Sequence, residues 1–346
     1  MAVQRLKIAC AGLGRMGSRH ALNFLNRTPR AELVAVFTPA PHEIEWARKE
    51  LEPHGVTIYT SYEEMLKHPE LAAVMIATVT AAHAEEAIMA IEADKHVLCE
   101  KPLIISTDIR CLCCKPHLKV LCGLSRRFDK SYRDTANYID SGGIGQPSVF
   151  RSQTCDKLDP SGFFVAYAEF SGGIFVDCTI HDIDLALWYF GQDSVVKSVS
   201  AVGVTAIAPD LRKHKDVDNG VGIVEFWGDK IAFFYACRMM AGGEHDMTEI
   251  IGTKGKVAVN TNPSSSLVEV HESNGIRREL PQDYYSRFEY AFVTMTNEFT
   301  AACLDNTELP FKLSGAVKAL TIGSALQESM NSGKKINFDE TGRRID

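Results

Sequence analysis

The sequence predicts an α/β fold in two domains, on three observations. Over the first 125 residues, short apolar runs alternate with helical patterns, which is typical of a parallel sheet covered on both faces. A glycine motif follows the first apolar run. After Arg126 apolar runs succeed one another with few helical patterns between them, which favours a largely antiparallel sheet. We therefore expect a dinucleotide-binding domain over residues 1–124 and an α+β domain with a large, mainly antiparallel open sheet over residues 125–346.

The first domain is predicted to contain six strands and four helices. The strands are the apolar runs Leu6–Ala11, Leu33–Phe37, Val56–Tyr59, Ala73–Ala77, His96–Cys99 and Lys119–Cys122. The helical patterns between them are Met16–Asn26, Glu43–Leu51, Tyr62–Lys67 and Ala81–Ala93. In the last of these Ala84, Ala87, Ile88 and Ile91 share one face, as the helical period requires.

The second domain is predicted to contain seven strands and three helices. The strands are Ser148–Cys155, Lys197–Thr205, Gly220–Phe226, Lys230–Cys237, Met247–Ile251, Lys256–Asn260 and Leu267–His271. Short turns at residues 227–230 and 253–256 join neighbouring strands as hairpins. The helices are His181–Phe190, Ser286–Cys303 and Ser314–Met330.

The composition is that of a globular chain. Of the 346 residues 45% are hydrophobic and 23% charged, and the net charge is −7. A chain of this balance is neither disordered nor collagen-like, and it offers no basic surface for nucleic acid. No run approaches the ~20 apolar residues of a membrane helix, and no targeting segment is present. We expect a cytoplasmic protein whose ten cysteines are reduced.

The glycine motif has the sequence Gly12-Leu13-Gly14-Arg15-Met16-Gly17. It lies between a strand and a helix, the context in which such a motif binds a dinucleotide rather than forming a plain glycine turn. Gly12 would permit the tight turn, Gly14 the approach of a pyrophosphate, and Gly17 close packing of helix on strand. The helix N-terminus would supply amide donors to the phosphates.

The sequence lacks the usual signal that decides between NAD and NADP. NAD enzymes of this type carry a carboxylate at the tip of the second strand. Here the tip is Phe37-Thr38-Pro39-Ala40, and the nearest downstream cation is Arg48. Thr38 could hydrogen-bond to either cofactor, and Arg15 could reach the adenosine side. We expect NAD, with NADP as the alternative.

Two further segments carry reactive side chains. Lys101 follows the fifth predicted strand and precedes Pro102, at the sheet edge where ligands bind in folds of this type. Asp177 and His181 are spaced i, i+4, so on one helix they would share a face. An imidazole suits removal of a hydroxyl proton, and a neighbouring carboxylate can orient it. The alternatives are a solvated lysine, a core histidine and a structural ion pair.

The ordered set of motifs resembles one known family over essentially the whole chain. The set comprises the glycine motif, Glu100-Lys101-Pro102, Arg126-Arg127-Phe128-Asp129, residues 172–182 with Asp177 and His181, and residues 333–339. It is similar to the glucose-fructose oxidoreductase / inositol dehydrogenase (Gfo/Idh/MocA) family of NAD(P)-dependent enzymes, especially to inositol 2-dehydrogenases. The resemblance implies a Rossmann domain and a second domain whose open sheet forms an oligomer interface.

The resemblance also implies roles for particular residues. Lys101, Asp177 and His181 match the catalytic lysine, aspartate and histidine: Lys101 beside the nicotinamide, His181 as general base, and Asp177 on the substrate. The expected cofactor site consists of Gly12, Gly14, Arg15, Met16, Gly17, Thr38, Ala77, Thr78, His83, Glu100 and Lys101. The expected substrate contacts are Arg127, Asp156, Asp177 and His181. No metal site is expected.

One segment departs from the family pattern. Residues 103–118 stand where the family carries a full amphipathic helix, and they are about one turn of 3.6 residues short. The segment is rich in cysteine, with Cys111, Cys113, Cys114 and then His117. We interpret it as a shortened helix with buried thiols, because C-x-C-C lacks the usual zinc spacing. A metal site is the alternative.

The expected activity is hydride transfer between NAD(P) and a secondary alcohol of a cyclic polyol or sugar-like molecule. Two alternatives remain: a ketone or imine reductase with the same site, and a non-catalytic dinucleotide-sensing regulator of the same fold. The joint presence of Lys101, Asp177 and His181 favours an enzyme over a regulator. The open sheet face favours a homodimer or homotetramer.

Overall fold

The computed structural model describes residues 4–103, 115 and 117–345. The chain forms two compact units. Unit 1 runs to Ser125 and takes in Tyr290–Val317, while unit 2 comprises Arg126–Glu289 and the chain from Lys318 onward. Two long helices change unit along their length: α10 (Tyr284–Asp305) begins in unit 2, and α11 (Leu313–Ser332) ends there. The expected single boundary at residue 124 does not account for Tyr290–Val317, where the chain returns to unit 1.

Unit 1 is built on a six-stranded sheet of order β3-β2-β1-β4-β5-β6. All its strand pairs are parallel. The strands are β1 (Leu6–Ala11), β2 (Ala31–Phe37), β3 (Thr57–Tyr59), β4 (Ala73–Ile76), β5 (His96–Cys99) and β6 (Val120–Cys122). These parallel pairs confirm the predicted parallel α/β domain. Continuous apolar runs predict such strands because helices bury both faces of a parallel sheet.

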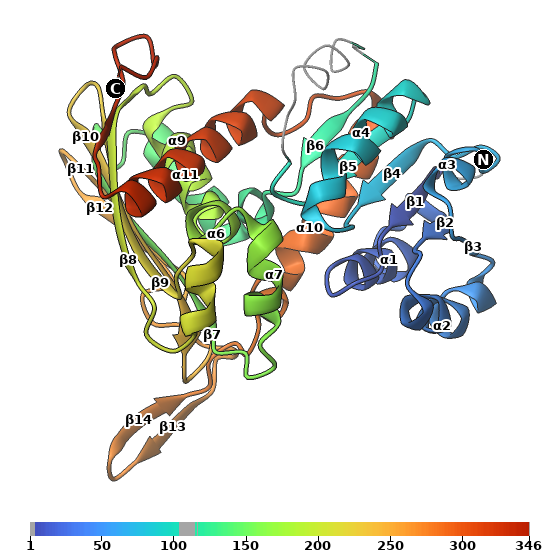
Figure 1. The fold of residues 1–346 in the computed structure, drawn as a ribbon, viewed down its shortest axis with the longest axis horizontal. Coiled ribbons are helices and arrows are strands. Elements are labelled where there is room, and N and C mark those ends of the chain that lie inside the picture. The colour runs from blue at the N-terminus through green and yellow to red at the C-terminus, as the bar shows by residue number, and fades with distance from the viewer. Residues whose placement is uncertain (1–3, 104–114, 116, 346) are drawn as a thin grey trace. The chain divides into compact units, whose positions relative to one another are not determined.

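The helices of unit 1 follow the strands in alternation, as Figure 1 shows. They are α1 (Gly17–Asn26), α2 (Pro41–Glu50), α3 (Tyr62–Leu66) and α4 (His83–Glu92). The sheet core consists of side chains with no solvent exposure, among them Ile8, Val36 and Ile76. The strand order reverses beside β1, which pairs with β2 on one side and β4 on the other. Ligands of open α/β sheets bind at the carboxyl ends of the strands at such a point.

Unit 2 is built on a seven-stranded sheet of order β12-β11-β7-β10-β9-β8-β15. The strands are β7 (Pro147–Lys157), β8 (Val196–Val204), β9 (Asn219–Phe226), β10 (Lys230–Met240), β11 (Met247–Gly252), β12 (Lys256–Val259) and β15 (Ile336–Asn337). The sheet is mainly antiparallel, as predicted, but its central pair, β7 with β10, is parallel. A separate hairpin of β13 (Glu269–Glu272) and β14 (Gly275–Arg278) follows β12.

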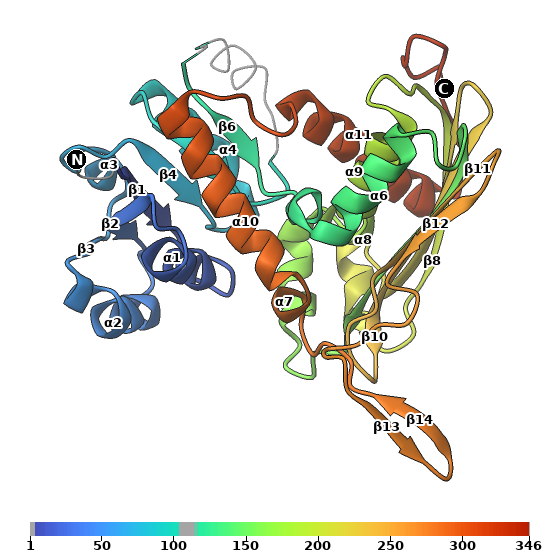
Figure 2. The ribbon, with the colours of Figure 1, turned by 180° about the vertical axis from the view of Figure 1, so that it is seen from behind.

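Helices lie on one face of the unit 2 sheet, which Figure 2 shows from behind. They include α6 (Lys130–Asp140), α7 (Phe163–Ser171), α8 (Ile174–Asp177) and α9 (Ile180–Phe190). Only α9 was predicted among these four. The sequence does carry a start signal for α6: the Asp129 carboxylate caps it by accepting from the amides of Ser131 and Tyr132. Only Tyr132, Thr135 and Ala136 of this helix are buried, so few apolar residues mark its inner face.

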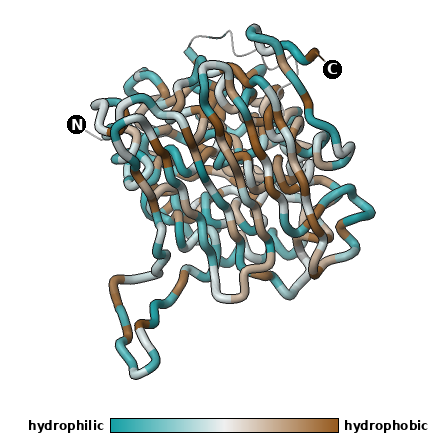
Figure 3. Tube along the Cα trace, turned by 90° about the vertical axis from the view of Figure 1, so that its left-hand side faces the viewer, coloured by the Kyte–Doolittle hydropathy of each residue, from teal (hydrophilic) through white to brown (hydrophobic). Residues whose placement is uncertain are grey.

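In the part of the chain that the structure describes, the other face of this sheet is not covered by a helix. Figure 3 looks at that face and shows its hydrophobic bands. Apolar side chains project from it on neighbouring strands, with Val202 67%, Ile223 45% and Ile231 47% exposed. Of the helices in the described residues, none is long and apolar enough to cross a membrane.

Candidate active site

The glycine turn of unit 1 connects β1 to α1 under tight steric limits. Gly12 has φ +80°, and a Cβ there would lie 2.7 Å from the carbonyl oxygen of Ala77 and from the amide nitrogen of Thr78. A Cβ on Gly17 would lie 2.0 Å from the carbonyl oxygen of Gly12. Only glycine fits these two positions. The turn therefore brings the ends of β1 and β4 against each other.

Gly14 differs from its two neighbours in the motif. A Cβ there would meet only Oε1 of Glu43, at an ordinary 3.5 Å. The described chain thus gives no steric reason for glycine at this position, whereas close approach of a ligand backbone does. Met16 lies at the N-terminus of α1, and Arg15 beside it is exposed. Open space at Gly14 and the N-terminus of α1 beside it fit the pyrophosphate of a dinucleotide.

Thr38 lies after β2, fully buried, and its hydroxyl is used within the chain. Its Oγ1 donates to Oε2 of Glu43 at 2.5 Å and accepts from the amide of Ala40 at 3.1 Å. The same Glu43 oxygen accepts from the amide of Leu13 at 3.0 Å. The Thr38 hydroxyl is therefore hydrogen-bonded to a carboxylate of α2, and its expected contact with a cofactor stays a prediction.

Thr78 and His83 hold the loop after β4 rather than facing outward. The Thr78 hydroxyl donates to Oε2 of Glu86 at 2.6 Å, and burial raises the pKa of Glu86 to about 7. The ring nitrogens of His83 lie 3.2 Å from the carbonyl oxygens of Thr78 and Pro102. Burial lowers the pKa of His83, so the neutral imidazole is favoured. We assign His83 to joining these two loops.

Lys101 lies just after β5 and is held there by the residue before it, Glu100. The Glu100 carboxylate accepts from the amide of Lys101 at 3.2 Å and lies 2.7 Å from Nε2 of His20 on α1. Burial alone would raise the pKa of Glu100, but His20 and Lys101 outweigh it and hold that pKa below its usual range. The Lys101–Pro102 peptide bond is cis. Glu100 thus positions Lys101 and links it to the helix of the glycine turn.

Unit 2 contains the other two predicted catalytic residues, on two short successive helices. Asp177 ends α8 and His181 lies in the first turn of α9, so the expectation that both share one helix is wrong. His181 is 4% exposed, and its Nε2 lies 3.1 Å from the hydroxyl of Tyr284. The two rings tilt against each other at 5.5 Å between centroids. Tyr284 therefore fixes the orientation of the imidazole and gives its Nε2 a hydrogen-bonding partner.

Asp177 is held by an arginine that the sequence did not single out. Nη2 of Arg238 donates to Oδ2 of Asp177 at 3.1 Å, and Nη1 donates to Oδ2 of Asp216 at 2.8 Å. The other oxygen of Asp216 accepts from the amide of Ile174 in α8. The guanidinium is buried, so this bridge fixes the position of Asp177 relative to its own helix.

The thiol of Cys178 lies close to the carboxylates of both Asp156 and Asp177. Sγ of Cys178 lies 3.7 Å from Oδ2 of Asp156 and 3.8 Å from Oδ2 of Asp177. Glu244 also approaches Asp156, and burial together with the Asp156 charge raises the pKa of Glu244 to about 8. The raised pKa favours the protonated form of Glu244, which can donate to its neighbour. Asp156 and Asp177 together present acceptors suited to hydroxyl groups.

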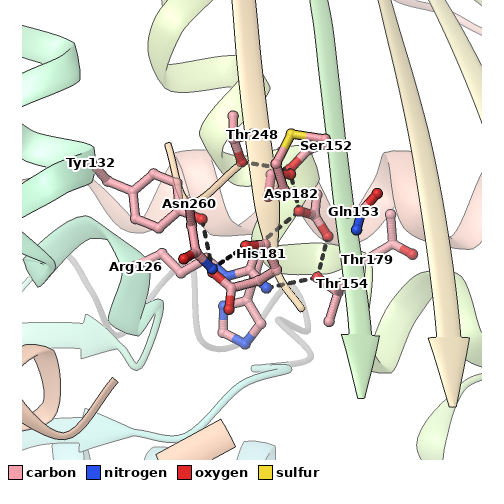
Figure 4. Close-up of polar contacts among 12 residues, drawn as sticks. Arg126, Tyr132, Ser152, Gln153, Thr154, Thr179, His181, Asp182, Thr248 and Asn260 are labelled. Carbon is pink, nitrogen blue, oxygen red and sulfur yellow. Dashed lines mark hydrogen bonds and ion pairs between the residues drawn. The ribbon is translucent and has the colours of Figure 1, made fainter. Parts of the chain in front are cut away.

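A buried polar network lies directly behind His181, shown in Figure 4. Asp182 has no solvent exposure and accepts from Arg126 at 2.7 Å and from the hydroxyls of Ser152 and Thr154. Arg126 in turn donates to Thr154 at 2.6 Å. This network ties α9 to β7, because Asp182 belongs to the helix and Ser152 and Thr154 to the strand. The network therefore fixes the position of the preceding residue, His181.

Arg127, an expected substrate contact, forms an internal ion pair. Its Nε and Nη2 atoms donate to the two carboxylate oxygens of Asp184 at 2.7 and 2.8 Å. The guanidinium also lies over the ring of Trp188, 4.6 Å from its centroid. Both charged partners are buried, so Arg127 fastens the start of unit 2 to α9. This ion pair gives Arg127 a structural role, and its expected contact with the substrate stays a prediction.

The cysteine-rich segment falls largely outside the described residues. That holds for Cys111, Cys113 and Cys114 and for the expected shortened helix. His117 is described, and its Nε2 lies 2.8 Å from Oδ1 of Asp94. Among the residues that the structure does describe, no group of three or more histidine, cysteine or acidic side chains could hold a metal ion.

Sequence reasoning missed four residues that shape these sites: Glu43, Arg238, Glu244 and Tyr284. Glu43 had one usable signal, since it stands in the first turn of a helix that begins at Pro41, near the glycine turn in an alternating fold. Arg238 lies among apolar residues of β10, where a charge indicates a buried partner, whereas Glu244 lies in the loop between β10 and β11 and carries no such signal. Nothing in the local sequence distinguishes Tyr284 from Tyr285.

The parallel sheet, the glycine turn at its switch point and the second, mainly antiparallel sheet are those of a two-domain dinucleotide-binding enzyme. Residues 6–110 match the family model of the oxidoreductase family with an NAD-binding Rossmann fold, and residues 132–258 match the GFO/IDH/MocA C-terminal domain. The chain belongs to the GFO/IDH/MocA family of oxidoreductases.

Several known proteins are similar to this chain over nearly its full length. The scyllo-inositol 2-dehydrogenase (NAD(+)) of Bacillus subtilis is 31% identical, covering 97% of each chain. The myo-inositol 2-dehydrogenase of Thermotoga maritima is 26% identical over 97% of this chain and 99% of its own. The structure of scyllo-inositol dehydrogenase from Lactobacillus casei with bound NAD(H) and scyllo-inositol has a TM-score of 0.90 at 32% identity, covering 96% and 99%.

Proposed function

We propose that this protein is an NAD-dependent inositol dehydrogenase, oxidising one secondary alcohol of a cyclic polyol. One observation carries the proposal: Lys101, Asp177 and His181 all stand in a chain that is 31% identical, end to end, to a scyllo-inositol 2-dehydrogenase. A protein that only senses dinucleotides has no need of a lysine, an aspartate and a histidine in these places.

Each residue has a role that its surroundings support. His181 takes the proton of the reacting hydroxyl, and Tyr284 holds its ring. Lys101 stabilises the negative charge that develops on the substrate oxygen. Asp177 and Asp156 accept hydrogen bonds from further hydroxyls of the ring. The glycine turn would hold NAD⁺, which would supply the acceptor for the hydride of the carbinol carbon.

The substrate chemistry follows from the charge around Asp177. The carboxylates of Asp156 and Asp177 are partly neutralised by Arg238, and the raised pKa of Glu244 favours its protonated form. Such a cluster is rich in acceptors and keeps a net negative charge, because Arg238 is shared with Asp216. It suits a neutral polyol with several hydroxyl donors better than a sugar acid, whose carboxylate the two aspartates would repel.

The experiment is nicotinamide absorbance during turnover. NAD⁺ and NADP⁺ are offered separately with scyllo-inositol, myo-inositol, aldoses and sugar acids. We expect reduction of NAD⁺ with an inositol and a far smaller rate with sugar acids. Turnover only in the reverse direction, with a ketone or imine, would assign a reductase. NADH binding without turnover of any alcohol or ketone would assign a regulator and overturn the proposal.

We also propose that the protein is a homodimer or homotetramer formed through the open face of the unit 2 sheet. The exposed apolar side chains of β8, β9 and β10 support this, because contiguous apolar surface of this kind is typical of an interface. Light scattering measures the assembly: a dimer or tetramer is expected, and V202K is expected to weaken it. A cytoplasmic location is proposed as well, since the ten cysteines of the chain would stay reduced there.

A further inference from the structure

The carboxylate of Glu43 borders the glycine turn, although Glu43 belongs to α2. Its Oε2 accepts two hydrogen bonds, from the amide of Leu13 inside the turn at 3.0 Å and from the Thr38 hydroxyl after β2 at 2.5 Å. Thr38 is fully buried and is itself fixed by the amide of Ala40. The side chain of Glu43 is thus anchored at the carboxyl ends of β1 and β2.

The second carboxylate oxygen of Glu43 faces the open side of the turn. Oε1 lies 3.5 Å from the position that a Cβ on Gly14 would take, and it is the atom nearest to that position. Gly14 is also the motif position where the described chain leaves room. In α/β sheets of this type, the adenosine ribose of a dinucleotide binds beside the glycine turn at the tip of the second strand. Oε1 is therefore available to a ligand in that place.

We propose that Glu43 is the residue that selects NAD over NADP in this protein. It would accept hydrogen bonds from the adenosine ribose hydroxyls, and its negative charge would repel a 2′-phosphate. This inference rests on the proposed NAD-dependent function. The usual carboxylate at the tip of β2 is absent, since Thr38, Pro39 and Ala40 stand there. The helix that follows supplies the acid instead, and Thr38 orients it.

The test measures binding of the reduced cofactors alone. Dissociation constants of NADH and NADPH are determined by nicotinamide fluorescence, without substrate, for the wild type, E43Q and E45Q. Glu45 lies on the same helix and is exposed, so E45Q removes the same charge away from the turn. We expect the wild type to bind NADH about tenfold or more tightly than NADPH, which corresponds to about 1.4 kcal/mol. E43Q should lower that ratio by about tenfold, while E45Q leaves it unchanged.

Several results would overturn the inference. One is equal affinity of the wild type for NADH and NADPH, which needs no variant. Another is an unchanged ratio in a folded E43Q. If E43Q does not fold, E43D decides: it keeps the charge on a shorter side chain and should still reject NADPH. NADPH binding by E43D as tight as NADH binding contradicts the inference. If the wild type binds neither NADH nor NADPH, that result would instead contradict the proposed function.

Discussion

The guanidinium of Arg238 donates to Asp177 at 3.1 Å, and it does so from a buried position on β10. The same group also donates to the fully buried Asp216 at 2.8 Å. One cation is therefore shared by two carboxylates, of which only Asp177 is partly exposed, with 19% of its side chain accessible. Arg238 thus sets both the place and the effective charge of Asp177, and we assign it as a positioning residue.

Replacing Arg238 tests this assignment. R238Q should lower kcat/KM for the polyol by about 10- to 100-fold, because truncating one partner of a buried charge pair costs about 2–5 kcal/mol and part of that loss reaches Asp177. R238K keeps the charge but cannot reach two carboxylates in the same way, so its activity should be intermediate. Steady-state kinetics gives both values, and NADH affinity should stay unchanged.

The control for Arg238 is R151Q, because Arg151 lies on β7 of the same unit with 46% of its side chain exposed. R151Q should behave as the wild type. A folded R238Q with unaltered KM and kcat would show that Asp177 does not depend on Arg238. Thermal denaturation of each variant separates loss of position from loss of fold.

Tyr284 should matter for the rate because its hydroxyl lies 3.1 Å from Nε2 of His181. Y284F keeps the ring contact and removes only that hydrogen bond, whose net value is about 1 kcal/mol. We expect kcat to fall by about fivefold and the pH profile of kcat to shift, since the His181 imidazole loses its hydrogen-bond partner. H181A should cost far more, on the order of 10²–10⁴-fold. Y290F is the matched control, since Tyr290 is 78% exposed.

Glu244 predicts a pH dependence of stability. Burial and the nearby charges of Asp156 and Asp246 raise its pKa to about 8, from an ordinary value of 4.5. The folded protein thus keeps a proton that the unfolded chain releases above pH 4.5. The stability due to this group is complete below that pH and is lost as the pH rises through about 8. Glu86, with a pKa of about 7, acts in the same direction.

The E244Q variant isolates this contribution. Its amide stays neutral, so the fall in unfolding free energy between pH 5 and 8 should be smaller than in the wild type, by on the order of 2 kcal/mol. Urea denaturation across that range measures the difference. E279Q, at an exposed position, should follow the wild type. Parallel curves for E244Q and the wild type would mean that Glu244 is already ionised at neutral pH.

The sequence predicts most of the strands, but it misses β14 and β15, places β13 two residues early, and predicts side-chain partners poorly. Strands such as β1 and β5 were placed at their observed bounds, because a fully buried strand is a continuous apolar run between polar turns. Helix α6 was missed because it packs through few apolar residues. The glycine motif was interpretable because Gly12 and Gly17 meet steric limits set by backbone close by in the fold.

Partners distant along the chain could not be inferred in this way. Arg127 looks like a substrate contact in the motif, but it pairs with Asp184, 57 positions further on. Asp177 and His181 were placed on one helix because their spacing allows it, yet Cys178 and Thr179 separate two helices there. A single sequence records the spacing of such residues but not the tertiary contacts that decide their roles.

The buried pair of Arg127 and Asp184 gives the last prediction. Because both side chains are at least 95% buried and share two hydrogen bonds, removing one partner leaves an uncompensated charge. R127A should lower the free energy of unfolding by about 3–5 kcal/mol, and it also loses the contact with Trp188. The exposed pair of Lys130 and Asp134 offers the control, since K130A should cost less than about 1 kcal/mol. Urea denaturation measures both.

At a temperature where R127A is still folded, its KM for the polyol should equal that of the wild type. A raised KM with unchanged stability would assign Arg127 to the substrate site.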